Sequence, residues 1–73
     1  MKLTVMESTS LATVAYDANL ELLQIEFRDR TIYRYRQVPA DVHAALLRAP
    51  SKGSYFNRVI RGRFVFTRIH AES

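Results

Sequence analysis

The chain has 73 residues, 48% of them hydrophobic and 25% charged, and it carries a net charge of +4 with a pI of about 10.0. This length allows one small domain, and the composition is globular rather than disordered or repetitive. The absence of cysteine excludes disulfides and thiolate chemistry, and no apolar run has the length of a signal peptide or a membrane span. We therefore expect a cytoplasmic protein that does not enter a membrane.

The first part of the chain predicts strands. Leu3–Met6 is either a short strand or a flexible start, and Leu11–Tyr16 predicts a strand that ends in a turn at Asp17–Asn19. Leu20–Phe27 and Thr31–Val38 alternate apolar and polar residues with a period of two. This alternation indicates two neighbouring strands that bury one face.

A three-residue loop, Arg28–Arg30, aligns the apolar faces of these two strands. It pairs Phe27 with Thr31, Ile25 with Tyr33 and Leu23 with Tyr35. A two-residue loop would instead pair Ile25 with Arg34 and divide the core. Three-residue hairpin loops usually end on a left-handed residue, so Arg30 is predicted to carry strain of about 1 kcal/mol.

After Val38 the pattern changes to a helical period. Pro39 suits the first helical position and Asp41 suits the helix N-terminus. The apolar residues that share one face are Val42, Ala45, Leu46 and Ala49. Pro50 ends this predicted helix at Ala49.

A second helix and a last strand complete the chain. Ser51 is the predicted N-cap of a helix through Ile60 that stops near Gly62, and Arg63–Ile69 has strand propensity. His70–Ser73 is expected to be a frayed tail. The predicted fold is α+β: an antiparallel β-meander, two short helices and a final strand, in a single domain over residues 1–73 with its core at about 8–69.

The charge is divided unevenly along the chain. Residues 1–27 hold one base and four acids, a net −3, whereas residues 28–73 hold ten bases and three acids, a net +7. Such polarity is typical of a surface that attracts an anion, although scattered solubilising charge is the alternative.

The segment Tyr33–Arg36 has two interpretations. Aromatic rings alternating with arginines resemble a platform for single-stranded nucleic acid, with stacking from the rings and phosphate contacts from Arg34 and Arg36. Alternatively Tyr33 and Tyr35 belong to the core and the arginines cover the outer face, which the hairpin register favours.

The start of the second predicted helix offers a further anion site. Ser51, Lys52, Gly53 and Ser54 combine a helix N-terminus, a cation and two hydroxyls, but lack the full phosphate-loop pattern. The alternative is an ordinary cap in which Gly53 permits close packing. Further bases follow at Arg58, Arg61, Arg63 and Arg68, the last two on the predicted final strand.

Catalytic patterns are weak. His43 and Asp41 do not share a helix face, and His70 stands four residues from the end. Nothing brings two of Glu7, Glu21 and Glu26 together. We predict no catalytic residues, no metal site and no cofactor; an enzyme would require His43 and a carboxylate within hydrogen-bond reach in a cleft.

Taken together, several short motifs resemble the KTSC domain family. They are Tyr16-Asp17, Leu23-x-Ile25-x-Phe27, Tyr33-x-Tyr35, Val38-Pro39, Ala49-x-Ser51-x-Gly53, Phe56-Asn57 and Ile60-Arg61. The resemblance runs from about Ser8 to Ile69. Two positions where the family commonly has glycine hold Ala15 and Arg30 here, and both concern backbone conformation.

The resemblance implies a domain found at the C-terminus of some lysyl-tRNA synthetases and as small bacterial proteins, for which RNA binding has been suggested. It brings no catalytic residues. Its signature positions are Tyr33, Tyr35, Ser51, Gly53, Phe56, Asn57, Ile60 and Arg61.

We therefore predict a non-enzymatic module that binds RNA, or nucleic acid generally. The residues expected to contact phosphates are Arg34, Arg36, Lys52, Arg58, Arg61 and Arg63, with Tyr33, Tyr35 and Tyr55 as stacking residues. The alternative is an adaptor that docks on a larger transcription or translation complex, with Leu3–Met6 or Arg63–Ile69 as exposed strand edges. The oligomeric state is left open.

Overall fold

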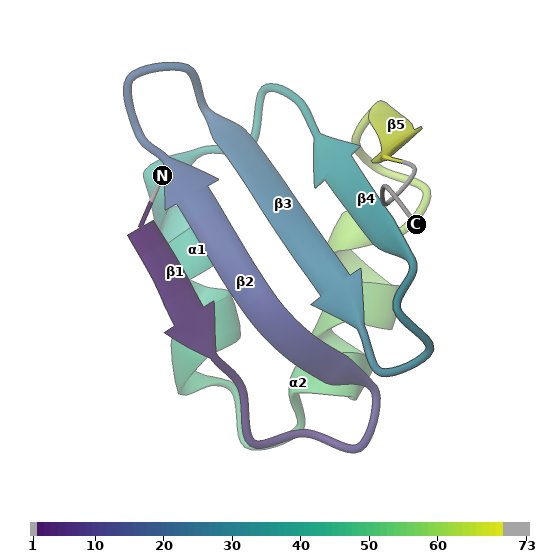
Figure 1. Cartoon of the computed structure of the whole chain (residues 1–73). Coiled ribbons are helices and arrows are strands. Elements are labelled where there is room, and N and C mark those ends of the chain that lie inside the picture. Colours follow the sequence, from purple (N-terminus) through teal and green to yellow (C-terminus); the bar gives the residue numbers. More distant parts are fainter. Residues whose placement is uncertain (1, 70–73) are drawn as a thin grey trace.

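A computed structural model of the chain describes residues 2–69. Within this range the strands form one five-stranded antiparallel sheet in the order β1-β2-β3-β4-β5, with the helices against one of its faces (Figure 1). The elements are β1 (Lys2–Val5), β2 (Leu11–Asp17), β3 (Leu22–Phe27), β4 (Ile32–Tyr35), α1 (Ala40–Arg48), α2 (Lys52–Tyr55), η1 (Phe56–Ile60) and β5 (Phe66–Ile69). The predicted α+β fold is confirmed, and the predicted tail His70–Ser73 lies outside the described residues.

The hairpin between β3 and β4 has the predicted register. The opposing pairs include Leu23 with Tyr35 and Ile25 with Tyr33. The Phe27 N–H donates to the Thr31 carbonyl (2.9 Å), and the Arg30 N–H donates to the Phe27 carbonyl (2.9 Å). Arg30 has a φ of 74°, so the third loop residue is left-handed as predicted.

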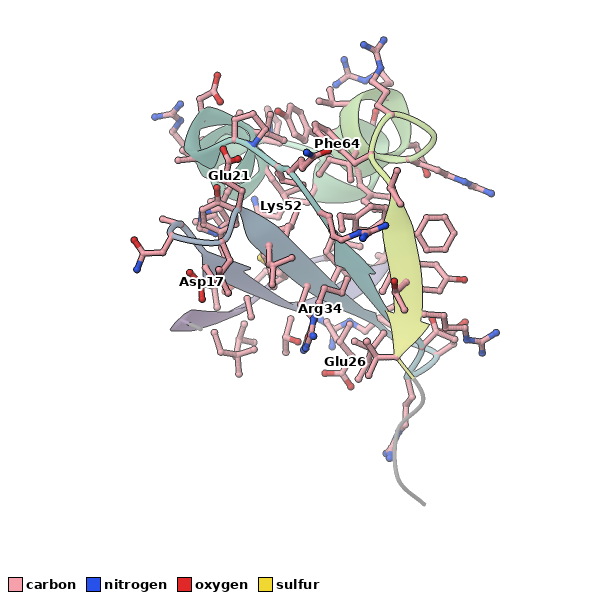
Figure 2. The ribbon with its side chains drawn as sticks, turned by 90° about the horizontal axis from the view of Figure 1, so that it is seen from above. Asp17, Glu21, Glu26, Arg34, Lys52 and Phe64 are labelled. Atoms are coloured by element: carbon pink, nitrogen blue, oxygen red, sulfur yellow. The ribbon has the colours of Figure 1, made fainter. Side chains whose placement is uncertain are left out.

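The two faces of the sheet have different chemistry. The face toward the helices carries the core, which includes Val14, Tyr16, Leu23, Ile25 and Tyr35 together with Leu46, Phe56 and Ile60. On the opposite face, here called the open face, Arg34 Nη2 donates to Gln24 Oε1 (2.8 Å) and Thr13 Oγ1 donates to Glu26 Oε1 (3.1 Å). Figure 2 shows Arg34 and Glu26 on this open face.

Two helix boundaries follow from local sequence. Pro39 is the N-cap of α1 rather than its first residue as predicted, and Ala49 is the C-cap because the next residue is Pro50. Ser51 caps α2 as predicted, and its Oγ accepts from the Ser54 N–H (3.4 Å).

The second helix does not continue as an α-helix to its end. Beyond α2 the chain widens into the π-helix η1, and the Arg61 N–H donates to the Phe56 carbonyl five residues earlier (2.9 Å). Gly62 then adopts a φ of 81° and ends the helix, as predicted. Arg63 lies in the following turn, with its N–H on the Ile60 carbonyl (3.1 Å). The final strand therefore begins at Phe66, and the prediction that it begins at Arg63 is wrong.

Left-handed residues also shorten two of the predicted strands. Glu21 (φ 53°) precedes β3, so the strand predicted over Leu20–Phe27 begins later. Gln37 (φ 59°) follows β4, so the strand predicted over Thr31–Val38 ends earlier. The first segment, left open by the sequence, is the strand β1 at one edge of the sheet.

Replacing Arg30 with glycine is expected to raise the free energy of unfolding by about 0.5–1 kcal/mol, because a left-handed conformation is costly for any residue with a Cβ atom. Arg30→Ala is the matched control, since it removes the same charge but keeps the Cβ atom. Thermal unfolding followed by circular dichroism should give the glycine variant the higher melting temperature. Equal melting temperatures for the two variants would contradict the strain assigned to this turn.

Candidate functional site

A hollow of about 370 Å³ lies on the helix side of the sheet, between the β3–β4 hairpin, η1 and β5. The aromatic side chains that line it are Phe27, Tyr33, Tyr35, Phe56 and Phe66. It is called the aromatic hollow below. The β4–β5 register creates it, because Phe66 lies opposite Tyr35 and therefore points to the helix side.

The rings divide into buried and accessible ones. Tyr35 is 2% exposed and Phe56 is 6% exposed, whereas Phe66 is 50% exposed. Tyr33 is half-buried, and its ring centroid lies 5.0 Å from that of Phe66 with a tilt of 39°. Tyr33 and Phe66 can therefore contact a ligand ring. Tyr35 was predicted to stack on a base, but it is too buried to do so.

The environment of Tyr35 agrees with a role in the core. Burial raises the pKa of its hydroxyl to about 12, with Tyr33 adding to the rise and the Arg61 cation opposing it. Its ring makes edge contacts with Tyr33 and Phe56 at centroid distances of 6.4 and 5.8 Å. Tyr35 thus packs beneath the accessible rings of Tyr33 and Phe66.

Polar groups surround the aromatic hollow. They belong to Ser10, Asp29, Thr31, Asn57 and Arg61. The Thr31 N–H and Oγ1 both donate to Asp29 Oδ1 (3.0 and 2.7 Å), and these bonds hold the pKa of the Asp29 carboxyl below its usual range, with a smaller contribution from Arg68. Arg61 follows the wide turn of η1, so the π-helix sets where this cation leaves the helix.

A second hollow, of about 570 Å³, lies beside the first at the start of α2. It is called the polar hollow because its lining contains Glu7, Ser8, Thr9, Ser10, Ser51, Lys52, Ser54, Asn57 and Arg58. Ser10, Gly53 and Asn57 line both hollows. The two hollows therefore adjoin at these three residues, one with an aromatic lining and the other with a polar lining, and together they are called the groove below.

Gly53 lies close to Ser10 at the junction where the two hollows adjoin. A Cβ atom at this position would lie 3.4 Å from Ser10 Oγ, in contact without overlap. A methyl group at residue 53 would narrow the junction and leave the backbone in place, since Gly53 does not have a positive φ.

The loop that carries Ser10 is held by Arg28. Its Nε donates to the Ser8 carbonyl (3.1 Å) and its Nη2 donates to the Met6 carbonyl (2.9 Å). The Ser8 Oγ accepts from the N–H groups of Ser10 and Leu11 (both 3.2 Å). Arg28 therefore acts as a support for this wall of the groove.

Residues at the start of α2 already have partners within the chain. Lys52 Nζ donates to the Ala49 carbonyl (2.9 Å), and Arg58 Nε donates to Ser54 Oγ (3.3 Å). The helix cap accounts for Ser51 and Ser54, so the interpretation as an ordinary cap explains these bonds without an anion.

The structure brings only part of the predicted set together. The predicted residues that line the groove are Lys52, Arg58, Arg61, Tyr33, Tyr35, Ser51, Gly53 and Ser54. The predicted residues that line neither hollow are Arg34, Arg36, Arg63 and Tyr55. Lys52 lies on the helix side and Arg34 on the open face (Figure 2), so the six bases do not form one continuous patch.

Sequence reasoning missed several residues of the groove: Phe27, Phe66, Ser10 and Asp29. The sequence could have indicated Phe66, because side chains alternate along the final strand. The register of that strand beside β4 decides which of its rings lies next to Tyr33. Ser10 and Asp29 lie in loops, where no periodic pattern indicates which way a side chain points.

His43 packs against the core. Its ring stacks on Tyr16 with a centroid distance of 4.5 Å, and the Tyr16 hydroxyl donates to the Val38 carbonyl (2.6 Å). Its Nε2 is buried without a hydrogen-bond partner among the described residues, and burial lowers the pKa of the imidazole.

Within residues 2–69 no three His, Asp or Glu side chains lie close enough to hold a metal ion. Over the same residues no helix is long and apolar enough to span a membrane.

Comparison with known proteins identifies the family. Residues 7–64 match the KTSC domain. The chain belongs to the KTSC domain family. A KTSC domain protein from Yersinia pestis, known from a crystal structure, is 32% identical and superimposes with a TM-score of 0.91, over 94% of this chain and 97% of that one.

Relatives contain the domain in two settings. An uncharacterized protein of Stutzerimonas stutzeri is 41% identical over 61 residues, which are 84% of this chain and 86% of that protein. A lysine–tRNA ligase of Nostoc punctiforme is 36% identical over 63 residues, which are 86% of this chain but 11% of the ligase. The domain therefore occurs as a small protein and as a minor part of a larger enzyme.

Most of the signature positions of the family resemblance lie around the groove. Of the eight signature positions in this sequence, all except Ile60 line one of the two hollows. Ile60 is fully buried in the core. Residue 33 on β4 is far along the chain from residues 53, 57 and 61 of the helical segment, and the fold brings them together around the groove.

The burial of His43 predicts that stability falls in mild acid. Because the folded chain resists protonation of this imidazole, the unfolded chain binds more protons below the ordinary histidine pKa of 6.5. The free energy of unfolding should therefore be retained above that pH and decrease as the pH falls through it. His43→Phe keeps a ring against Tyr16 and should flatten this dependence in urea titrations between about pH 7.5 and about pH 5.5. A dependence as steep as that of the original protein would contradict the assignment.

Proposed function

We propose that this KTSC domain binds single-stranded RNA along the groove and acts as a binding module rather than a catalyst. The observation that carries the proposal is the junction of the aromatic and polar hollows at Ser10, Gly53 and Asn57. A nucleotide combines an aromatic base with a charged phosphate, and the groove offers a separate end for each.

The aromatic hollow suits an unstacked base. Tyr33 and Phe66 expose ring surface on which a base can stack, and such stacking contributes about 1–3 kcal/mol per base. The volume of about 370 Å³ lies within the range of small-molecule sites. Asn57 and Thr31 add donors and acceptors for the edge of the base.

The polar hollow suits the phosphates that follow the base. Lys52 and Arg58 line it, and Arg61 lines the aromatic hollow on the same helix. Further donors for phosphate oxygens come from the hydroxyls of Ser8, Ser10, Ser51 and Ser54. Three cations along one groove account for phosphate contacts without a continuous basic surface.

The relatives support an RNA partner. The ligases of Nostoc punctiforme and Trichormus variabilis that contain a similar region are named for a reaction on tRNA. The region is 11% of each enzyme. A role in RNA binding for the domain is consistent with its presence in enzymes that are named for a reaction on tRNA.

A second candidate function is docking on a protein. Leu3 is 61% exposed and Val5 is 74% exposed on β1, which is an edge strand of the sheet. Exposed apolar residues on an edge suit the addition of a strand from a partner. A folded chain that binds no RNA would favour this function over the proposed one.

The proposal predicts that charge in the groove, rather than charge in general, controls RNA affinity. In fluorescence anisotropy with a labelled unstructured RNA oligonucleotide, Arg58→Ala/Arg61→Ala should weaken binding about tenfold. With two or three phosphate contacts, the affinity of the original protein should also fall about tenfold between about 50 mM and about 200 mM salt. Gly53→Ala should weaken binding while leaving thermal stability unchanged or higher, because alanine favours the helix but narrows the junction.

The control is Arg34→Ala/Arg36→Ala, which removes the same charge outside the groove. It should bind RNA as the original protein does. An equal loss in both double variants would show that binding depends on net charge alone and would contradict the groove as the site. The absence of RNA binding by the folded protein would contradict the proposed function itself.

A further inference from the structure

The geometry points to guanine as the base that the aromatic hollow selects, with the Asp29 carboxylate as the group that recognises it. This inference rests on the proposed function and adds a base preference to it. Asp29 is the carboxylate that lines the aromatic hollow among the described residues.

The Asp29 side chain is held in a defined position. Both donors of Thr31, its N–H and its Oγ1–H, bind Asp29 Oδ1. A carboxylate has about four acceptor positions, so about two remain on the other oxygen for a ligand. The lowered pKa of this carboxyl keeps it ionised at neutral pH, and it can therefore only accept hydrogen bonds.

The charges along the groove set the direction of a bound nucleotide. Asp29 lines the aromatic hollow only, whereas Lys52 and Arg58 line the polar hollow only. Arg61 also lines the aromatic hollow and Glu7 also lines the polar hollow, so one carboxylate faces one cation in the first and two cations in the second. The polar hollow therefore attracts a phosphate more strongly than the aromatic hollow does. The base therefore points toward Asp29, and its hydrogen-bonding edge meets a carboxylate.

A carboxylate discriminates among the four bases because it needs donors. Guanine presents two neighbouring donors, N1–H and the 2-amino group, to the acceptor positions of Asp29. Cytosine and adenine each present one amino group beside a ring nitrogen that accepts. Uracil presents N3–H between two carbonyl oxygens, which the carboxylate repels. The expected order of affinity is guanine first and uracil last.

The test compares short uridine oligonucleotides in which one central base is uracil, adenine, cytosine, guanine or hypoxanthine. Isothermal titration with the full chain should show that guanine binds about tenfold more tightly than uracil, the discrimination expected of a paired hydrogen-bond contact. Hypoxanthine keeps N1–H but lacks the 2-amino group, so inosine should bind between the two. This series changes only the ligand and does not depend on the folding of a variant.

Asp29→Asn then tests the residue. Its amide keeps an oxygen for the Thr31 donors but places an NH₂ group against the donors of guanine, so the guanine preference should disappear while binding of RNA remains. Asp17→Asn is the matched control: Asp17 Oδ1 accepts from the Asn19 and Leu20 N–H groups in another turn, and Asp17 lines neither hollow. The control should keep the preference.

The outcomes distinguish the base preference from RNA binding itself. Equal binding of all five oligonucleotides would overturn the guanine assignment and leave RNA binding standing. A guanine preference that survives in Asp29→Asn would overturn the role of Asp29. Binding of none of the oligonucleotides would overturn the proposed function and this inference with it.

Discussion

The pairing of β3 with β4 is the constraint on which the rest of the structure depends. Because side chains alternate along a strand, a shift of one residue would send Tyr33 and Tyr35 of β4 to the open face. The three-residue turn prevents this shift, at the cost of a left-handed Arg30. The same register puts Tyr33 and Tyr35 beneath the helices and sets Asp29 and Thr31 at the rim of the aromatic hollow. The hairpin thus determines both the core and one wall of the groove.

The helix layer supplies the opposite wall. Phe56, at the start of the π-turn η1, is buried in the core, and Arg61, at its end, lies near enough to Tyr35 to affect its pKa. π-turns occur frequently at functional sites. Gly62 then reverses the chain toward β5, which brings Phe66 beside Tyr33. In this arrangement the buried rings give the groove a rigid floor, and the exposed groups around it are left to contact a ligand.

Much of the fold was predictable because its signals are local. The alternation of β3 and β4 and a one-sided core were sufficient for the hairpin register, including the conformation of Arg30. The π-turn was not predictable, since its residues have the same apolar spacing as an α-helix. The last strand begins at Phe66 rather than Arg63 because residues 63–65 lie in the turn and loop after Gly62, although they have strand propensity. The candidate site was predictable only in part. Charge counted along the chain does not reveal that Arg34 and Lys52 lie on opposite sides of the sheet (Figure 2).

The most direct test of the groove as the RNA site is a map of backbone amide shifts in the ¹⁵N-labelled protein during titration with an unstructured RNA oligonucleotide. The account predicts that the largest changes occur at Ser10, Gly53, Asn57 and Phe66, around the two hollows. It predicts little change at Gln24, Arg34 and Thr67, which form one row across the open face. Changes concentrated on that row, with the groove unaffected, would contradict it.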